Sequence, residues 1–279
     1  MHAEDANFTF VHFTDTHIMA GITYTSDFGW QVDTQKTLER VIRAINALDP
    51  APDFAIIGGD LTSPDLIDRS RRPTPEEYEP SYQVLHETLQ LLNCPVHMLM
   101  GNHDDRIAFH RVMQHEVPSP DFPHYFSFNH HGYHFIGLDT LEPGKHGGYV
   151  DAQQLDWLRD DLHAHQGEPT LAFMHHHPWP VEIEWLDTQN LRNGDDVVGL
   201  LRDHGGVRWM ICGHVHLDKE IERDGLTQLT SPSTCFQTSK VSQARKTYAG
   251  PPGFRVVRVK GRELSTQVLY LHADRNDEL

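Results

Sequence analysis

Apolar and polar residues follow one another along most of the chain in a pattern that predicts strands and helices in turn. Short apolar runs, rich in β-branched and aromatic residues, favour strands, and between them lie segments whose apolar residues recur with the spacing of one helix face. This alternation is typical of an α/β protein. The predicted strands are 8–14, 54–57, 96–100, 125–128, 133–138, 171–174 and 207–212, and the predicted helices are 34–48, 75–92, 151–163 and 191–201.

The pattern changes from about residue 219 onward, where strand candidates separated by turns follow one another. These candidates are 220–222, 227–230, 254–259 and 264–271. Strand–helix alternation followed by antiparallel strands predicts two packed mixed sheets flanked by helices, a four-layer α/β/β/α sandwich. We expect residues 1–279 to form one domain, in which the strand-rich portion completes the second sheet or makes an oligomer contact. A homodimer is the expected oligomer, because two-fold dimers are the commonest kind.

Polar clusters follow five of the predicted strands directly. Ligands in open α/β sheets lie outside the carboxyl ends of the strands, so we expect these clusters to meet at one site. Glycines within them allow the backbone to approach that site closely. The clusters are Asp15-Thr16-His17, Gly58-Gly59-Asp60, Gly101-Asn102-His103-Asp104, His175-His176-His177-Pro178 and Gly213-His214-Val215-His216.

The side chains of these clusters are those of a transition-metal site. Several imidazoles, two carboxylates and an amide suit Mn, Fe or Zn, and they do not suit Ca²⁺. They are too many for one tetrahedral ion, whereas two ions that share one carboxylate would use them all. Each short motif by itself is more often a structural hydrogen-bonding pair or a turn, so the prediction depends on their occurrence together after strands.

Composition narrows the classes of function. The chain of 279 residues has 40 Asp and Glu against 23 Lys and Arg, and a net charge of −17 disfavours a nucleic acid polymer as partner. No apolar run is long enough for a membrane span, so no membrane association is expected. The three cysteines are interpreted as free thiols, and the first residues lack the features of a signal peptide. Together these features predict a cytoplasmic protein.

The order of the five clusters resembles that of the calcineurin-like metallophosphoesterases, over roughly residues 9 to 235. The resemblance implies the metallophosphoesterase fold and a dinuclear metal centre. It implies that Asp15, His17 and His216 hold one metal, and that Asp60 bridges both. Asn102, His214 and one histidine of the triplet would hold the other metal.

The histidine triplet departs from the His-His-Pro-Pro sequence that is common in the family. Position relative to the strand end and to Pro180 favours His175 as the ligand, and His176 is the alternative. The metals are expected to be two divalent or trivalent ions, most simply Mn or Fe, with Zn also suitable.

A narrower resemblance concerns the substrate. The segments 185–187, 191–193, 212–214 and 231–235 are similar to those of bacterial class III cyclic-nucleotide phosphodiesterases. This implies hydrolysis of a small phosphodiester, 3',5'-cyclic AMP to 5'-AMP, by a hydroxide held between the metals. The alternatives are a glycerophosphodiester or broad-specificity phosphodiesterase, and a metal-free interaction module on the same fold.

Position along the chain suggests roles around the substrate, because His103 lies beside the predicted ligand Asn102. His103 is expected to protonate the leaving oxygen, with Asp104 to orient it, and Asn102, His103 and His216 are expected to contact the phosphate. An aromatic ring would stack on the base, and the sequence leaves open which one. The candidates are Trp30, Trp179, Trp185 and Phe236.

Overall fold

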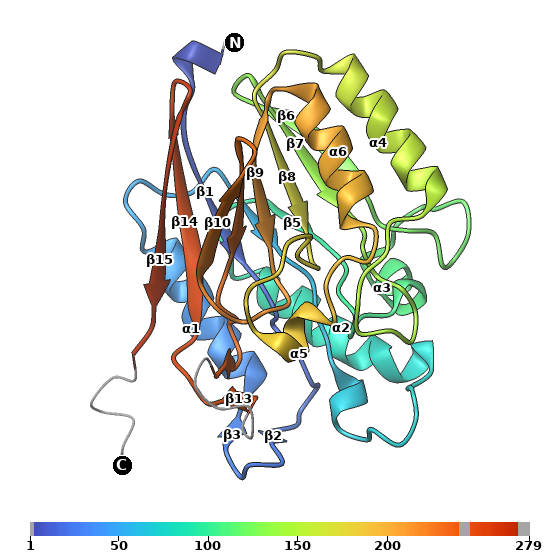
Figure 1. Cartoon of the computed structure of the whole chain (residues 1–279). Coiled ribbons are helices and arrows are strands. Elements are labelled where there is room, and N and C mark those ends of the chain that lie inside the picture. The colour runs from blue at the N-terminus through green and yellow to red at the C-terminus, as the bar shows by residue number, and fades with distance from the viewer. Residues whose placement is uncertain (1–2, 240–245, 273–279) are drawn as a thin grey trace.

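Two β-sheets lie face to face in the computed structural model, which describes residues 3–239 and 246–272 (Figure 1). The five-stranded sheet has the order β15 (Glu263–Tyr270), β14 (Gly253–Lys260), β1 (Asn7–Phe13), β4 (Phe54–Ile57) and β5 (Val96–Met98). The six-stranded sheet has the order β10 (Lys219–Arg223), β11 (Leu226–Thr230), β9 (Val207–Cys212), β8 (Thr170–Met174), β7 (Tyr133–Leu138) and β6 (Phe126–His130).

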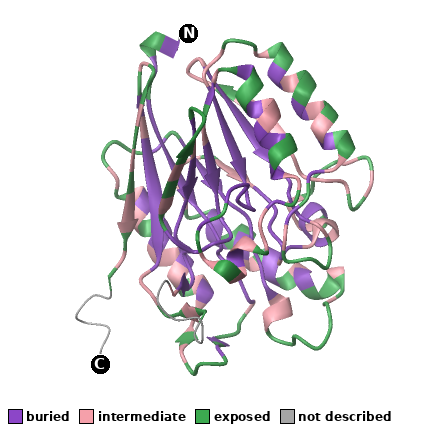
Figure 2. Ribbon diagram, in the orientation of Figure 1, coloured by how far each residue is buried: buried purple, intermediate pink, exposed green. Residues whose placement is uncertain are grey.

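Helices cover the outer face of each sheet. The five-stranded sheet packs against α1 (Thr34–Asn46), α2 (Pro75–Leu89) and α3 (Arg106–Met113). The six-stranded sheet packs against α4 (Ala152–Ala164) and α6 (Gly194–His204), whose outer sides face solvent (Figure 2). The smaller elements are 3₁₀ turns at Ala3–Asp5 and Pro64–Leu66, the helix α5 (Glu184–Asp187), and the ribbons β2 (Tyr24–Thr25) with β3 (Gln31–Val32) and β12 (Gln237–Thr238) with β13 (Thr247–Tyr248).

Three layers of apolar side chains fill the spaces between these four layers of backbone. Strand β1 contributes to two of these layers, because its side chains alternate between the two faces of the sheet. Val11 and Phe13 pack under the helices, whereas Phe10 packs between the sheets. There the ring of Phe10 stacks on that of Phe54 at 5.1 Å and meets Phe135 of the other sheet edge to face at 5.8 Å. The predicted four-layer sandwich is confirmed.

The strands after residue 219 divide between the two sheets. Strands β10 and β11 extend the six-stranded sheet beside β9, but β14 and β15 join the five-stranded sheet, where β14 pairs antiparallel with β1. The expectation that this portion completes the second sheet therefore holds for β10 and β11 and is wrong for β14 and β15, and the alternative of an oligomer contact stays a prediction. Local patterns do not reveal strand order, because the pairing of β14 with β1 joins distant parts of the chain.

Three helices differ from the prediction. The short helix α5 and the helix α3 were missed, although Asp105 caps α3 through a hydrogen bond from the Ala108 N–H. Helix α6 begins at Gly194 and not at 191, because Leu191 is bridged to Gly148 and Asn193 occupies the N-cap. Within the described ranges, no helix is long and apolar enough to cross a bilayer. The single domain, the homodimer and the cytoplasmic location stay predictions.

Candidate metal centre

The five polar clusters meet at one edge of the two sheets. Strands β1, β4 and β5 run parallel to one another, as do β7, β8, β9 and β11, so their carboxyl ends lie together. Isolated bridges and backbone hydrogen bonds then join the loops, such as that from the Asp15 N–H to the Gly59 carbonyl. The predicted site is therefore assembled from both sheets.

Five of the seven predicted metal ligands have a left-handed backbone conformation. Positive φ is uncommon for residues with a side chain, and it persists only where the surrounding structure imposes it. Such strain concentrates at functional sites. The five residues are Asp15 (φ 55°), His17 (44°), Asp60 (48°), His214 (68°) and His216 (51°).

Glycines permit the close approach of these loops. Gly59 has a φ of +94°, and a Cβ atom there would collide with the ring of His175. A Cβ atom on Gly101 would collide with Asp60. The expectation that these glycines let the backbone approach the site is confirmed.

One half of the centre consists of Asp15, His17, Asp60 and His216. The Nε2 atoms of His17 and His216 face each other at 3.1 Å, and the His216 Nε2 lies 3.1 Å from Asp15 Oδ1. Asp60 Oδ2 lies 3.9 Å from the His17 Nε2. All four residues are buried, and their ligand atoms lie within 4.8 Å of one another, as the donors of one ion would.

The other half contains Asn102, His175 and His214. Four buried atoms across the centre have no hydrogen-bond partner among the residues that the structure describes: Asp15 Oδ1, Asn102 Oδ1, His175 Nε2 and His214 Nε2. Buried polar atoms of this kind are costly unless a ligand satisfies them. The donor set therefore fits metal ions. Asp60 lies between the halves, with its Oδ2 3.3 Å from the His175 Nε2.

His175 and His176 differ in whether a ring nitrogen is free. His175 forms a hydrogen bond through Nδ1 to the Gly58 carbonyl at 2.7 Å, so its Nε2 is left for the centre. In His176, Nδ1 contacts the Thr140 hydroxyl at 2.7 Å and Nε2 contacts the His146 carbonyl at 3.1 Å. This geometry favours His175, the first choice of the sequence analysis.

Partners outside the centre fix the orientation of the other rings. The Nδ1 atom of His17 contacts the Ser63 hydroxyl at 2.6 Å, and the Nδ1 atom of His216 contacts the Phe236 carbonyl at 2.7 Å. A hydrogen bond at Nδ1 holds the tautomer in which Nε2 carries a lone pair. These partners follow no motif, and the sequence analysis did not find them.

Burial and neighbouring charges determine which groups ionise. Burial alone would raise the pKa of Asp60, but the imidazoles of His175 and His103 outweigh it and hold that pKa well below its usual range. Burial opposes protonation of His175, yet the charge of Asp60 raises its pKa to about 9. Burial lowers the pKa of His17 to about 3. The neutral His17 is ready to bind a cation, whereas His175 would release a proton on doing so.

The structure pairs His103 with Asp65, which the sequence analysis did not single out. The His103 Nδ1 lies 2.6 Å from Asp65 Oδ2. Burial would lower the pKa of His103, but Asp60 and Asp65 outweigh it and raise the pKa to about 9. Asp65 lies in the 3₁₀ turn Pro64–Leu66 after β4, and no local pattern connects it with His103.

Asp104, expected to orient His103, instead joins two loops of the centre. Its carboxylate accepts backbone N–H groups of Leu61, Thr62 and Gly101 at 2.8–3.1 Å and the hydroxyl of Tyr82 at 2.9 Å. It thereby ties the segment after Asp60 to the segment that carries Asn102. We interpret Asp104 as a structural residue.

We expect Asp104→Ala to lower the free energy of unfolding by at least about 3 kcal/mol, because it leaves several buried donors without an acceptor. Urea unfolding with fitted m-values measures this change. Asp105→Ala is the matched control, since it removes only a helix cap and should cost about 1 kcal/mol. Equal losses in the two variants would contradict this role of Asp104.

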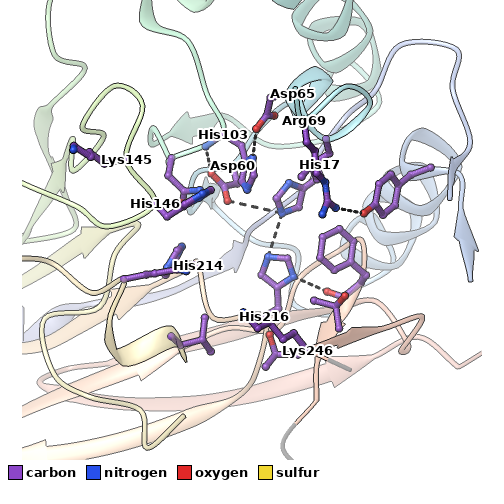
Figure 3. Close-up of a pocket in the computed structure, with 18 of the residues that line it drawn as sticks. His17, Asp60, Asp65, Arg69, His103, Lys145, His146, His214, His216 and Lys246 are labelled. Atoms are coloured by element: carbon purple, nitrogen blue, oxygen red, sulfur yellow. Dashed lines mark hydrogen bonds and ion pairs between the residues drawn. The ribbon is translucent and has the colours of Figure 1, made fainter. Parts of the chain in front are cut away.

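A cavity of about 600 Å³ opens above the centre (Figure 3). His17, Asp60, His103, His214 and His216 form its floor. Its size is that of a pocket for a small molecule. Aromatic and cationic side chains form the walls: Tyr24, Trp185, Phe236, Arg69, Arg71, Arg72, Lys145 and Lys246.

Cations bring positive charge to the cavity wall, although Arg69 and Arg71 also pair with Asp27 and Glu77. Arg69 donates to the Tyr24 hydroxyl at 2.8 Å, and Arg72 donates to the Asp104 carbonyl at 3.0 Å. Lys246 lies over the ring of Trp185 at 5.0 Å. A net charge of −17 therefore does not exclude an anionic substrate here.

The aromatic candidates for stacking separate into two pairs. Trp185 and Phe236 line the cavity, and Phe236 also stacks on His17 at 5.0 Å. Trp30 packs on the far side of Phe236 at 5.3 Å, and Trp179 is buried in the core under α6. Only the first pair is placed to meet a ligand.

Comparison with known proteins identifies the family. The model of the calcineurin-like phosphoesterases matches residues 8–218, which is most of the chain. The chain belongs to this family. The predicted resemblance is thus confirmed, and so is the class of enzyme, a metal-dependent phosphoesterase.

Individual relatives agree with this assignment. A 3',5'-cyclic adenosine monophosphate phosphodiesterase, CpdA, of Pseudomonas aeruginosa is 28% identical over 259 residues, covering 92% of this chain and 87% of the relative. A probable glycerophosphodiester phosphodiesterase, GpdQ, of Arcobacter nitrofigilis is 31% identical over 242 residues, covering 82% and 79%. A solved dimetal phosphatase from Danio rerio has the same fold, with a TM-score of 0.67 at 16% identity and coverage of 94% and 98%.

Proposed function

We propose that this protein is a dinuclear phosphodiesterase that hydrolyses 3',5'-cyclic AMP to 5'-AMP. The observation that carries the proposal is the convergence of unpaired ligand atoms at and beneath the floor of a cavity with aromatic and cationic walls. One metal would be held by Asp15, His17 and His216, the other by Asn102, His175 and His214, with Asp60 shared. The names of relatives such as CpdA support this substrate class.

The two metals, when bound, would neutralise the phosphate and lower the pKa of a water molecule. The protein's own contribution begins with the substrate's position. Lys145 and Lys246 reach the cavity and would attract the anion, and Trp185, which lines the same cavity, would stack on the purine. The floor residues Asn102, His103 and His216 would then face the phosphate.

His103 would complete the reaction by protonating the leaving oxygen. Addition of water to phosphorus breaks the bond from phosphorus to the ribose O3', and that oxygen takes a proton as it departs. His103 lines the cavity, and Asp65 keeps it protonated and fixes its ring through the 2.6 Å contact. Asp60 also accepts the backbone N–H of His103 at 2.9 Å, which ties the acid to the metal centre.

The relative named as a glycerophosphodiester phosphodiesterase makes that activity the second candidate. The two candidates differ in what the aromatic wall would do. A purine gains from stacking on Trp185, by about 1–3 kcal/mol, whereas glycerophosphocholine has no base to stack. Trp185 therefore discriminates between the substrates.

We expect kcat/KM for cyclic AMP to exceed that for glycerophosphocholine, with Mn²⁺ present, and chelation to abolish both activities. Trp185→Leu should raise KM for cyclic AMP about tenfold and leave KM for glycerophosphocholine nearly unchanged. Steady-state kinetics with both substrates measures this.

The control is Trp157→Leu, since Trp157 lies on α4 and packs on Tyr125. A higher kcat/KM for glycerophosphocholine than for cyclic AMP would show that the second candidate activity is the correct one. Absence of turnover with any added metal would favour the metal-free interaction module instead.

A further inference from the structure

Three histidines outside the active site gather where α3 approaches the start of β6. His110 lies in α3, His115 follows the helix directly, and His124 precedes β6. Each offers a ring nitrogen, and these nitrogens lie within 4.8 Å of one another. His110 is buried and His115 is exposed, so the group is anchored in the protein and open to solvent on one side.

Hydrogen bonds to backbone carbonyls orient two of these rings, those of His110 and His124. The Nε2–H of His110 donates to the Phe122 carbonyl at 2.8 Å, which leaves Nδ1 as the nitrogen with a lone pair. The imidazole of His124 likewise has a hydrogen bond to the Met98 carbonyl. Metal-binding histidines have this arrangement, in which a carbonyl holds one nitrogen so that the other faces the ion.

The distances within the group suit a small ion. The Nδ1 atoms of His110 and His115 are 3.4 Å apart, and two imidazole ligands of a tetrahedral zinc ion are separated by about 3.4 Å. The rings of His115 and His124 are nearly parallel, 5.0 Å apart with an angle of 5°. Phe109 packs against both rings, at 5.1 and 4.8 Å, and shields the inner side of the group.

The backbone around the group is also fixed. Helix α3 ends at Gln114, which has a left-handed conformation, and the His115 N–H donates to the His110 carbonyl at 3.0 Å. The His124 N–H donates to Asp139 at 2.7 Å. The rings therefore project from constrained positions, with one nitrogen of each ring within 4.8 Å of the others.

Another histidine group shows what distinguishes this one. His134 lies near His165 and Glu168, but its Nδ1 contacts Asn129 at 2.7 Å and its Nε2 contacts Asp161 at 2.6 Å. Both nitrogens of His134 are engaged by side chains, so no lone pair is offered to a metal. The nitrogens of His110 and His115 instead face each other.

We propose that His110, His115 and His124 form a separate site for one Zn²⁺ ion, with water in the remaining position. Three neutral imidazoles are a ligand set for zinc, and they differ from the mixed carboxylate, amide and imidazole set of the active site. Zinc here joins the end of α3 to the start of β6 and closes the loop between them. Because α3 starts just after Asp104, the site braces the helix that adjoins the active centre.

Metal stoichiometry tests the site without reference to catalysis. Full-length protein is dialysed against micromolar Zn²⁺, and bound zinc per chain is measured by mass spectrometry of the metal. We expect the unmodified protein to bind one equivalent more than either His115→Ala or His110→Gln. His115 is exposed, and glutamine at 110 retains an N–H for the Phe122 carbonyl, so both variants should fold.

Thermal unfolding gives the second readout. Zinc at about 100 times its Kd should raise Tm by roughly 5 °C more in the unmodified protein than in His115→Ala. His86→Ala, which removes an exposed histidine from α2, is the control and should behave as the unmodified protein. Equal stoichiometry in all variants, or an equal loss in His86→Ala, would overturn the proposal.

Discussion

We expect Asp60→Asn to abolish phosphodiester hydrolysis, with kcat reduced by more than about 100-fold, and to bind its metals far more weakly. Loss of a residue that only orients a metal ligand lowers metal affinity by about 10–100-fold. We expect a larger effect at Asp60, because Asp60 is placed to bind both ions directly. Asparagine has the same shape and still accepts the His103 N–H, so the variant removes charge and little else. Metal content and turnover of bis-p-nitrophenyl phosphate are the measurements.

Asp161→Asn provides the matched control for this variant. Asp161 also accepts a close contact from a histidine, His134, at 2.6 Å, but it lies on α4, away from the metal centre. It should retain its metals and its turnover. If Asp60→Asn kept two equivalents of metal and normal kcat, the assignment of Asp60 as the shared ligand would be wrong.

The second large effect concerns His103. The loss of kcat on its substitution should depend on whether the leaving group needs a proton. His103→Gln should lower kcat for cyclic AMP by about 10²–10⁴-fold, the usual contribution of a general acid. The same variant should lose little activity on bis-p-nitrophenyl phosphate, because p-nitrophenolate departs without a proton. Equal losses on both substrates would instead assign His103 to binding of the phosphate.

Asp65→Asn should reproduce this pattern with a smaller loss. Asp65 helps to raise the pKa of His103, so removal of its charge lowers that pKa. His103 acts in its protonated form, and activity is lost as the pH rises through its pKa. The alkaline limb of the pH–rate profile should therefore move to lower pH in Asp65→Asn, a shift that a merely structural defect would not produce.

The sequence allowed the layers of the fold and the convergence of the site to be predicted, because both depend on local patterns. A short run of buried apolar residues marks strands such as β1, and a ligand placed just after a strand must lie at the carboxyl edge of its sheet. The clusters that contain Asp15, Asp60 and His214 were found by that rule, and the family resemblance then supplied their individual roles. Their common left-handed backbone could not be anticipated, because it is imposed by loops that pack on one another.

What the sequence did not reveal depends on contacts between distant segments. Asp65 meets His103 across 38 positions, and Phe236 accepts the hydrogen bond that orients His216 from a loop without any motif. Asp104 was assigned to His103 because the two are adjacent in the chain. Its carboxylate instead accepts hydrogen bonds from backbone N–H groups of two loops. These loops are brought together only by the fold, so the contact has no signature in the sequence.

The position of β1 between β4 and β14 also has a consequence for synthesis of the protein. Phe10 pairs with Val257, and Ser233 donates to the carbonyl of Asp15 at 2.8 Å. The first ligands to leave the ribosome are therefore fixed by segments that are translated almost last. A nascent chain interrupted near residue 218, where the family match ends, would contain all seven predicted ligands and still lack the strand that holds β1 in place. We expect a chain that ends there to have no enzymatic activity, although it contains every predicted ligand.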